Sequence, residues 1–336
     1  MSRRCTTARA LRPGLGWGCL LAMAACLGDA SAARMACAPL PELPSGWPRT
    51  PHAGQVRVQG GRFAMGGDEG YRDERVRQAQ VGTFWIDRTE VTNAQFAAFV
   101  QATRHVTDAE RQGEAAVFAI PDAAELRQRP LAWWRIVPGA DWRHPDGPAS
   151  DIRGREREPV RLVTQADALA YARWLGRDLP TEAEWEFAAK GGTLRQAEAR
   201  LDGGPRDASG RPSANYWQGS FPLMDTAEDG HAGIAPVACY APNALGLYDM
   251  IGNAWEWTRD ADACPSGDGA VRPRQSHANG DPAVLRQAPA QARTVIKGGS
   301  FLCSPDYCVR YRAAAREVQD PTLATSHVGF RTVSRR

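Results

Sequence analysis

The sequence predicts an α+β fold with few regular elements and long ordered loops. Three observations lead to this prediction. Apolar residues alternate along short segments near the start of the chain, which is typical of strands. Residues that cap helices recur between positions 92 and 192. After Gly192, helical periodicity gives way to short motifs rich in Gly, Asn, Asp and Trp, which is typical of a chain built from fixed turns and large aromatic packing units.

Two segments before residue 90 are predicted strands. Gln55 to Met65 alternates between apolar and polar residues, and we expect it to form a hairpin with Gly60-Gly61 at its turn. Gln80 to Asp87 is the second strand candidate. Strands in this part of the chain supply the β component of the predicted fold.

Helix starts are marked by threonines that are followed three residues later by a residue able to complete a capping box. They predict a helix that begins after Thr92, a short one after Thr107 that Gly113 ends, one from Thr164 to Leu175, and one after Thr181 that Gly191-Gly192 closes. These helices supply the α component.

The first residues form a targeting segment. A basic region is followed by an apolar stretch from Leu15 to Leu27 and by the small-residue cleavage site Ala30-Ser31-Ala32. We therefore assign residues 1–32 to a signal peptide, 33–54 to a leader and 55–336 to the domain, with 264–290 as a Pro-, Gly- and Ala-rich surface insertion. A second interpretation is a lipoprotein anchored through Cys26. Either one predicts export, to the periplasm or the medium.

The net charge of +3 is too small to indicate nucleic acid binding, and we expect none. Export implies an oxidising compartment in which disulfides persist. After cleavage the chain would keep Cys37, Cys239, Cys264, Cys303 and Cys308. This number is odd, so at least one thiol is free, intermolecular or functional. A bond between Cys239 and Cys264 is one candidate pairing, and the role of Cys37 is open.

Cys303 and Cys308 lie five residues apart, on either side of a Pro-Asp turn that can bring their sulfurs together. Two thiolates form a soft donor pair that suits Cu(I) better than harder ions. The alternative is a structural disulfide across a short loop, which an exported protein favours. The spacing alone leaves both interpretations open.

Two segments are rich in oxygen donors and glycine bends. Residues 215–231 end in Asp225, Glu228 and Asp229, and residues 246–257 carry Asp249 and Glu256. Six to eight oxygens, including backbone carbonyls, are the ligands of Ca²⁺. The alternatives are an acidic surface loop for the first segment and a Trp-rich core hairpin for the second.

Several motifs occur together in a fixed order. They are Phe63-Ala64-Met65-Gly66, Glu90-Val91-Thr92-Asn93, residues 133–142, residues 179–186, residues 215–219, residues 252–257, the segment with Cys303 and Cys308, and Gly329-Phe330-Arg331. From Arg62 to Val333 this arrangement resembles the formylglycine-generating enzyme family, also called sulfatase-modifying factors. The resemblance implies a single loop-rich domain of low regular structure, a variant of the C-type-lectin-like fold. At about 150 residues per domain, a chain of 336 residues would suggest two domains, but the resemblance implies one.

The resemblance also implies an activity. Cys303 and Cys308 would bind Cu(I) as a bis-thiolate, and the cysteine of a client sulfatase, in a Cys-x-Pro-x-Arg motif, would add a third sulfur. Molecular oxygen and a thiol reductant would take part in its conversion to formylglycine. Ser300 matches the family's active-site serine. We expect a monomer.

Calcium ligands carry over residue by residue from the family. For one ion they are Asn215, the Tyr216 carbonyl, Asp229 and the His231 carbonyl. For the other they are Asp249, the carbonyls of Gly252 and Ala254, and Glu256. These ions would be structural, because they tie down loops that the sequence alone would not order.

This sequence departs from the family at Ser304, where some relatives have histidine, and at His327, where asparagine is frequent. Substrate handling near His327 is therefore open. A hypothesis of another class is a non-catalytic lectin-like binding or maturation module of the same fold. It predicts loss of an active-site cysteine or of Ser300, and this chain keeps all three.

Overall fold

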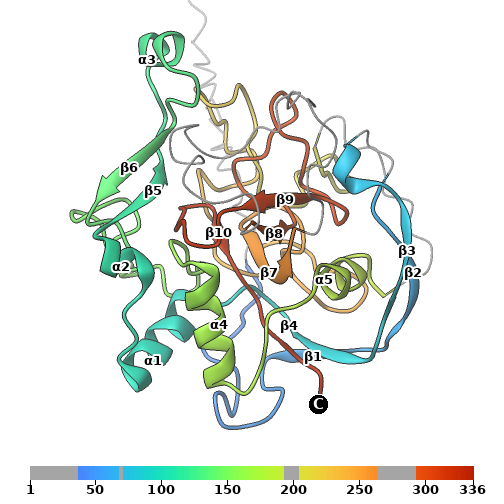
Figure 1. Ribbon diagram of the computed structural model, residues 1–336. Coiled ribbons are helices and arrows are strands. Elements are labelled where there is room, and N and C mark those ends of the chain that lie inside the picture. The colour runs from blue at the N-terminus through green and yellow to red at the C-terminus, as the bar shows by residue number, and fades with distance from the viewer. Residues whose placement is uncertain (1–36, 68–70, 193–203, 263–292) are drawn as a thin grey trace, which may run out of the picture. The chain divides into compact units, whose positions relative to one another are not determined.

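A long antiparallel ribbon opens the fold, in a computed structural model that describes residues 37–67, 71–192, 204–262 and 293–336 (Figure 1). β1 (Gln55–Val58) pairs with β4 (Phe84–Asp87), and β2 (Gly61–Met65) pairs with β3 (Arg77–Val81). A short 3₁₀ helix, η1 (Arg72–Glu74), precedes β3, and β11 (Val333–Ser334) pairs with the other edge of β4. Because β11 lies near the end of the chain, its pairing with β4 joins the end of the domain to its start.

The hairpin expected between residues 55 and 65 is wrong. β1 and β2 run on in one direction, since Val58 faces Phe84 and Gly61 faces Val81 in the same register. Gly60 lies against Gly82, where an added Cβ would be 2.3 Å from the Gly82 carbonyl carbon. A tight turn there would have left the apolar face of β3 and β4 without a partner, whereas the observed ribbon buries it against α5.

The helices begin where the capping residues predict. The four expected ones are α1 (Asn93–Thr103), α2 (Asp108–Gln112), α4 (Gln165–Trp174) and α5 (Glu182–Ala189), capped by Thr92, Thr107, Thr164 and Thr181. In each, the threonine hydroxyl accepts the third helical N–H, and the side chain at that third position bonds back. α3 (Ala123–Gln128), capped by Asp122, is a helix that the sequence analysis did not predict.

Two further sheets complete the fold. β5 (Glu114–Phe118) pairs with β6 (Trp134–Pro138). The other sheet has the order β10 (Val328–Gly329), β7 (Trp255–Ala261), β8 (Thr294–Lys297), β9 (Arg316–Gln319), and only its β10–β7 pair is parallel. Figure 1 shows α4 and α5 beside this sheet, and both pack against β7. The segment between β8 and β9 carries the two candidate cysteines.

The observed architecture confirms a single loop-rich α+β domain. In the parts of the chain that the structure describes, no helix follows Gly192, as the change in sequence texture predicts. No described helix is both long and apolar enough to span a bilayer. The predicted signal peptide, Cys26 and the insertion at 264–290 lie outside the described residues.

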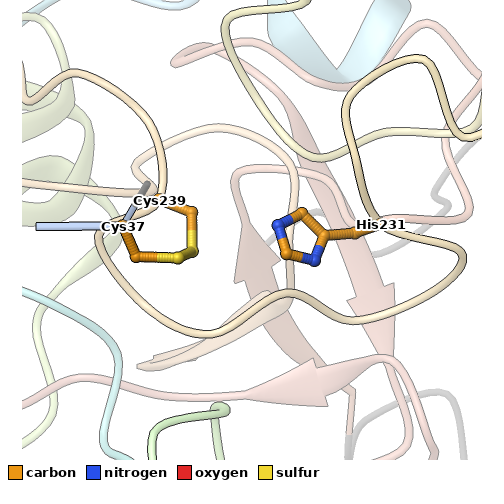
Figure 2. A group of neighbouring side chains, drawn as sticks. All are labelled: Cys37, His231 and Cys239. Carbon is orange, nitrogen blue, oxygen red and sulfur yellow. A yellow bond between two sulfur atoms is a disulfide. The ribbon is translucent and has the colours of Figure 1, made fainter. Parts of the chain in front are cut away.

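A disulfide joins the leader to the domain. Cys37 is bonded to Cys239, 202 residues away in sequence, so Cys239 does not pair with Cys264, which lies outside the described residues. Figure 2 shows the ring of His231 beside this bond. The ligand atoms of these three residues lie within 4.8 Å of one another, but the bond occupies both sulfurs. Spacing cannot determine connectivity, which is why the sequence did not predict this pair.

Other contacts hold the leader in place. The Ala38 N–H donates to the Ala238 carbonyl over 2.7 Å, and Arg157 donates to the Ala38 carbonyl over 2.7 Å. Trp47 is 9% exposed and packs edge-on against Trp174. Residues 37–54 are therefore part of the packed domain.

We predict that replacing both Cys37 and Cys239 by serine lowers the free energy of unfolding by about 5 kcal/mol, because the bond closes a very long loop in the unfolded chain. Chemical denaturation under non-reducing conditions measures the difference. Wild-type protein treated with a thiol reductant is the control and should approach the variant. Identical midpoints for the variant and the oxidised wild type would contradict the prediction.

Candidate functional site

The Cys303 and Cys308 sulfurs lie 3.3 Å apart, and both side chains are buried. This distance is well above the length of about 2.05 Å of a disulfide bond, so both are free thiols in contact. The Cys303 N–H donates to the Ser300 carbonyl, and the Cys308 N–H donates to the Ser304 carbonyl. The turn between β8 and β9 therefore aims two cysteines at one point, as the sequence predicts.

Glycine makes this turn sterically feasible. Gly299 has φ +81°, and a Cβ there would lie 2.4 Å from the Arg310 carbonyl oxygen. The next residue, Ser300, is fully buried, and its hydroxyl accepts a bond from the Leu302 N–H over 3.2 Å. Since the hydroxyl accepts this bond, its own proton can be donated to another group.

The two thiols differ in acidity. Burial opposes ionisation of Cys303, but the hydrogen bond from Cys308, the backbone and Arg310 together outweigh it, and the pKa of Cys303 is lowered. The same contact with Cys303, together with burial, raises the pKa of Cys308 well above its usual value. Of the two thiols, Cys303 is thus the one that ionises more readily.

Arg310 is the cation beside this pair, and acidic residues hold it. Its guanidinium lies 3.1 Å from Asp73 and 3.6 Å from Glu317, and it covers the Tyr71 ring at 4.3 Å from the centroid. Asp73 and Tyr71 come from the segment before β3. The ribbon therefore fixes the positive charge that faces the thiols.

In the first oxygen-rich segment, residues 215–231, only some of the predicted calcium ligands lie together. The Gln218 side-chain amide donates to the Tyr216 carbonyl and, over 2.8 Å, to Asp229 Oδ2. Two oxygens of the predicted calcium set therefore meet at one point. The His231 N–H donates to Asp229 Oδ1 over 3.0 Å, so the chain at His231 folds against the same carboxylate. Asn215 Nδ2 donates instead to the Gly233 carbonyl and to Asn253 Oδ1.

This donor set suits a hard cation. Asp229 is 2% exposed, and burial raises its pKa to about 6. In the described part of the chain its carboxylate contacts N–H donors and no positively charged side chain. A buried carboxylate without a countercharge, next to carbonyl and amide oxygens, fits Ca²⁺.

The second segment contains a buried ion pair. Arg331 donates from Nη2 to Glu256 Oε1 and from Nε to Glu256 Oε2, each over 2.7 Å, and Trp185 Nε1 also donates to Oε2 over 2.7 Å. Asp249 is close by, and its Oδ2 accepts the Ala238 N–H over 2.7 Å. Burial raises the pKa of Asp249 to about 6, and the Glu256 charge adds to this effect.

Glu90 is a third carboxylate here, and the sequence analysis did not assign it. It is fully buried, Asn253 Nδ2 donates to its Oε1 over 3.0 Å, and its Oε2 has no hydrogen-bond partner among the described residues. Burial and the Asp249 charge raise its pKa well above the usual value. Glu90 opens one of the motifs that carry the resemblance, but its role could not be read from the sequence, because its partner Asn253 lies 163 positions further on.

Three buried carboxylates thus surround one guanidinium. Such a surplus of negative charge, with one oxygen unpaired, fits a divalent cation. The predicted ligands Asp249 and Glu256 lie in this cluster. Gly252 and Ala254 belong to the turn between them, where the Gly252 N–H donates to the Gly298 carbonyl and Ala254 is buried.

His327 is in the interior. Its ring lies 4.8 Å from that of Trp134, and among the described residues neither ring nitrogen has a hydrogen-bond partner. Burial lowers its pKa to about 3, so it is neutral. Its backbone carbonyl accepts the Trp255 N–H over 2.9 Å, which fixes the chain at His327 beside β7. His327 thus contributes no positive charge.

A cavity of about 460 Å³ opens next to the thiol segment. Its walls include Phe301, two residues before Cys303, and Trp217, whose backbone N–H donates to the Cys303 carbonyl over 2.9 Å. Asp146, Glu158 and Asp225 also line it. Arg155 contacts Asp146 and Glu158, whereas Asp225 Oδ1 accepts only backbone N–H groups among its described contacts. The cavity has an apolar wall and a charged edge, to which Arg155 and Arg161 contribute as well as the three acids.

Comparisons with known protein sequences all point to the same family. A family model described as "Sulfatase-modifying factor enzyme 1-like domain" matches residues 41–336. Formylglycine-generating enzyme from Streptomyces coelicolor is 46% identical over 299 residues, which are 86% of this chain and 91% of that protein. Inactive C-alpha-formylglycine-generating enzyme 2 from Mus musculus is 38% identical over 290 residues, 83% of this chain and 85% of that protein. PvdO from Pseudomonas aeruginosa is similar in fold, with a TM-score of 0.55, 21% identity, and coverage of 85% of this chain and 95% of that one.

The raised pKa of Asp229 predicts a pH dependence. Burial raises it from 3.8 to about 6, so without a cation the folded protein binds this proton more tightly than the unfolded chain does. The resulting stability is present at low pH and is lost as the pH rises from about 4 to about 6. Thermal unfolding in a chelator should show this loss, and calcium should remove it, because the ion favours the ionised carboxylate.

Asp229→Asn is the matched variant for this measurement. It has no proton to lose, so its melting temperature should change less over the same pH range, and calcium should have less effect on it. A wild-type profile that is the same with chelator and with calcium would exclude a cation at Asp229.

Proposed function

Because the chain belongs to the sulfatase-modifying factor family, whose relatives include formylglycine-generating enzymes, we propose that it oxidises the cysteine of a client sulfatase to formylglycine. The client would present a Cys-x-Pro-x-Arg segment. Molecular oxygen would be the oxidant, and an external thiol would supply the remaining electrons. The observation that carries the proposal is the buried pair of free thiols at 3.3 Å.

The donor set suits Cu(I), because both ligands are soft sulfurs in a site closed to bulk water. Bound there, copper would supply the activation of oxygen. The contribution of the chain is to hold one thiolate at Cys303, to keep the Arg310 charge beside it, and to keep water out. Ser300, fully buried three residues before Cys303, can donate its proton to a polar group in the site.

The overall reaction balances with these reactants. The client CH₂–SH loses a C–H and its C–S bond and becomes CHO, and its sulfur leaves as hydrogen sulfide. Oxygen accepts four electrons, two from the client carbon and two from a pair of external thiols, which become a disulfide. Both oxygen atoms are released as water, and hydrolysis of the thioaldehyde consumes one water, whose oxygen becomes that of the aldehyde.

The cavity beside the thiol segment suits an extended client peptide. Phe118, Trp217 and Phe301 offer apolar contact for the segment around the client proline, and Asp225 at the edge offers a carboxylate for its arginine. Since Trp217 bonds the Cys303 backbone, a peptide in this cavity would lie next to the sulfur pair.

Calcium at the two oxygen-rich clusters would be structural in this proposal, because it would neutralise buried carboxylates on long loops. We also propose export to an oxidising compartment. The Cys37–Cys239 disulfide supports this, since such bonds are rare in reducing compartments.

Family membership alone does not establish catalysis, because one matching relative is named inactive. A lectin-like binding or maturation module is therefore the alternative. The retained thiol pair and the buried Ser300 favour the enzyme, since a binding module requires neither of them.

We predict that the copper-loaded protein, given oxygen and a thiol reductant, converts a Cys-x-Pro-x-Arg peptide to its aldehyde. Mass spectrometry would detect the mass lost when CH₂–SH becomes CHO. Cys303→Ser and Cys308→Ser should each abolish conversion, because neither leaves two sulfur ligands. Full conversion by either variant, or none by a folded and copper-loaded wild type, would reject the proposed activity in favour of the binding module.

We further predict that Asp225→Asn raises KM for this peptide about tenfold, as expected for the loss of one charge-assisted hydrogen bond. kcat should change little, because Asp225 does not contact the sulfurs. A peptide with glutamine in place of arginine is the control, and the wild type and the variant should handle it alike. An equal effect of the substitution on both peptides would place the client arginine elsewhere.

A further inference from the structure

Asn253 contacts both groups of predicted calcium ligands and the turn that carries the two thiols. It is fully buried, and its φ of +53° places it in the left-handed region, at the centre of the turn between Gly252 and Ala254. Its side-chain amide forms four hydrogen bonds, which is its full capacity.

The oxygen of this amide is hydrogen-bonded to the first cation cluster, which is the group of predicted calcium ligands around Asn215, Tyr216 and Asp229. Asn253 Oδ1 accepts Asn215 Nδ2 over 2.9 Å and the Ala235 N–H over 3.0 Å. The Asn253 N–H also donates to the Asn215 carbonyl over 2.8 Å. Asn215 is a predicted ligand through its side-chain oxygen, and its amide is planar. An ion that fixed that oxygen would therefore also fix the nitrogen that holds Asn253.

The nitrogen of the same amide is hydrogen-bonded to the second cation cluster, which consists of the carboxylates of Glu90, Asp249 and Glu256. Asn253 Nδ2 donates to Glu90 Oε1 over 3.0 Å and to the Ala235 carbonyl over 3.3 Å. The bond at Oε1 sets the orientation of the Glu90 carboxylate, whose Oε2 is the unpaired oxygen described above. The orientation of Asn253 thus determines where this buried oxygen points.

The backbone extends the link to the thiols. The Asn253 carbonyl accepts the Phe301 N–H over 2.9 Å, and the Gly252 N–H donates to the Gly298 carbonyl over 3.0 Å. Both partners flank Ser300 in the turn that leads to Cys303. One residue therefore contacts both cation clusters and the active-site turn.

We propose that Asn253 is a positioning residue that couples the two cation sites, so that calcium bound at one raises the affinity of the other. The inference rests on the proposed function, in which both clusters hold Ca²⁺. The first ion would order the Asn215–Asn253–Glu90 chain of hydrogen bonds, and the second would bind to a site already ordered. Coupling of this kind amounts to about 5- to 150-fold in affinity.

Calorimetric titration of the chelator-treated full chain with Ca²⁺ measures this coupling. Asp229→Asn disables the first cluster and leaves the second, and Asp249→Asn does the converse. The coupling factor is the product of the two wild-type association constants divided by the product of the two single-site constants. We expect a factor of about ten in chains that have Asn253.

Asn253→Gly keeps the left-handed backbone and removes the four side-chain bonds. In this background the coupling factor should fall to about one. A purely structural role would weaken both sites and leave the factor unchanged, and that result would overturn the proposal. If this variant does not fold, Asn253→Asp replaces it, because it keeps the acceptor for Asn215 and loses the donor to Glu90.

Glu90→Gln tests the last step of the chain. Its amide oxygen still accepts the bond from Asn253, but an NH₂ group replaces the unpaired oxygen, so calcium should bind more weakly at the second cluster and the coupling factor should fall. A coupling factor of one in the wild type overturns the proposal and leaves the cation sites and the oxidase activity intact. A folded chain that binds no calcium overturns the proposal together with the structural role of calcium, whereas the peptide assay tests the thiol chemistry independently.

Discussion

The buried pair between Arg331 and Glu256 is the interaction on which the C-terminal half of the molecule depends. Both side chains are almost inaccessible, and the guanidinium also donates to the carbonyls of Asp87 and Tyr248. One cation thus joins the end of β4, strand β7 and the loop before Gly252. Loss of either partner would leave an unpaired buried charge, at a cost of about 3–5 kcal/mol.

This pair does not neutralise its surroundings, because Glu90 and Asp249 remain as buried acids around the same guanidinium. The loops come together closely enough that a Cβ on Gly252 would lie 2.2 Å from the Asn215 carbonyl oxygen. Segments with so little regular structure cannot satisfy their polar groups through sheets or helices. Side-chain amides and, in the proposed function, cations take that role, and the thiol turn is built against them.

The local features of the fold could be predicted from the sequence. Thr92 and Thr181 begin helices because a capping box is complete within four residues. The pairing of β1 could not be predicted, because alternation identifies a strand without its partner. The site follows the same rule. Cys303 and Cys308 are close in sequence and meet as expected, whereas Glu90 and the Cys37–Cys239 bond depend on contacts across most of the chain.

The two cysteine pairs differ in oxidation state, since Cys37 and Cys239 are bonded whereas Cys303 and Cys308 are free thiols. In the chain-entropy model, closing the loop between Cys37 and Cys239 contributes about 5 kcal/mol, and closing the short loop between Cys303 and Cys308 about 2 kcal/mol. Both values describe the constraint on the unfolded chain; in the folded chain the sulfurs of Cys303 and Cys308 need to approach by only about 1 Å to form a bond. A soft cation bound to both thiolates would prevent this disulfide from forming. Under the proposed function, the compartment that oxidises Cys37 and Cys239 makes early metal loading a condition for the catalytic pair to survive.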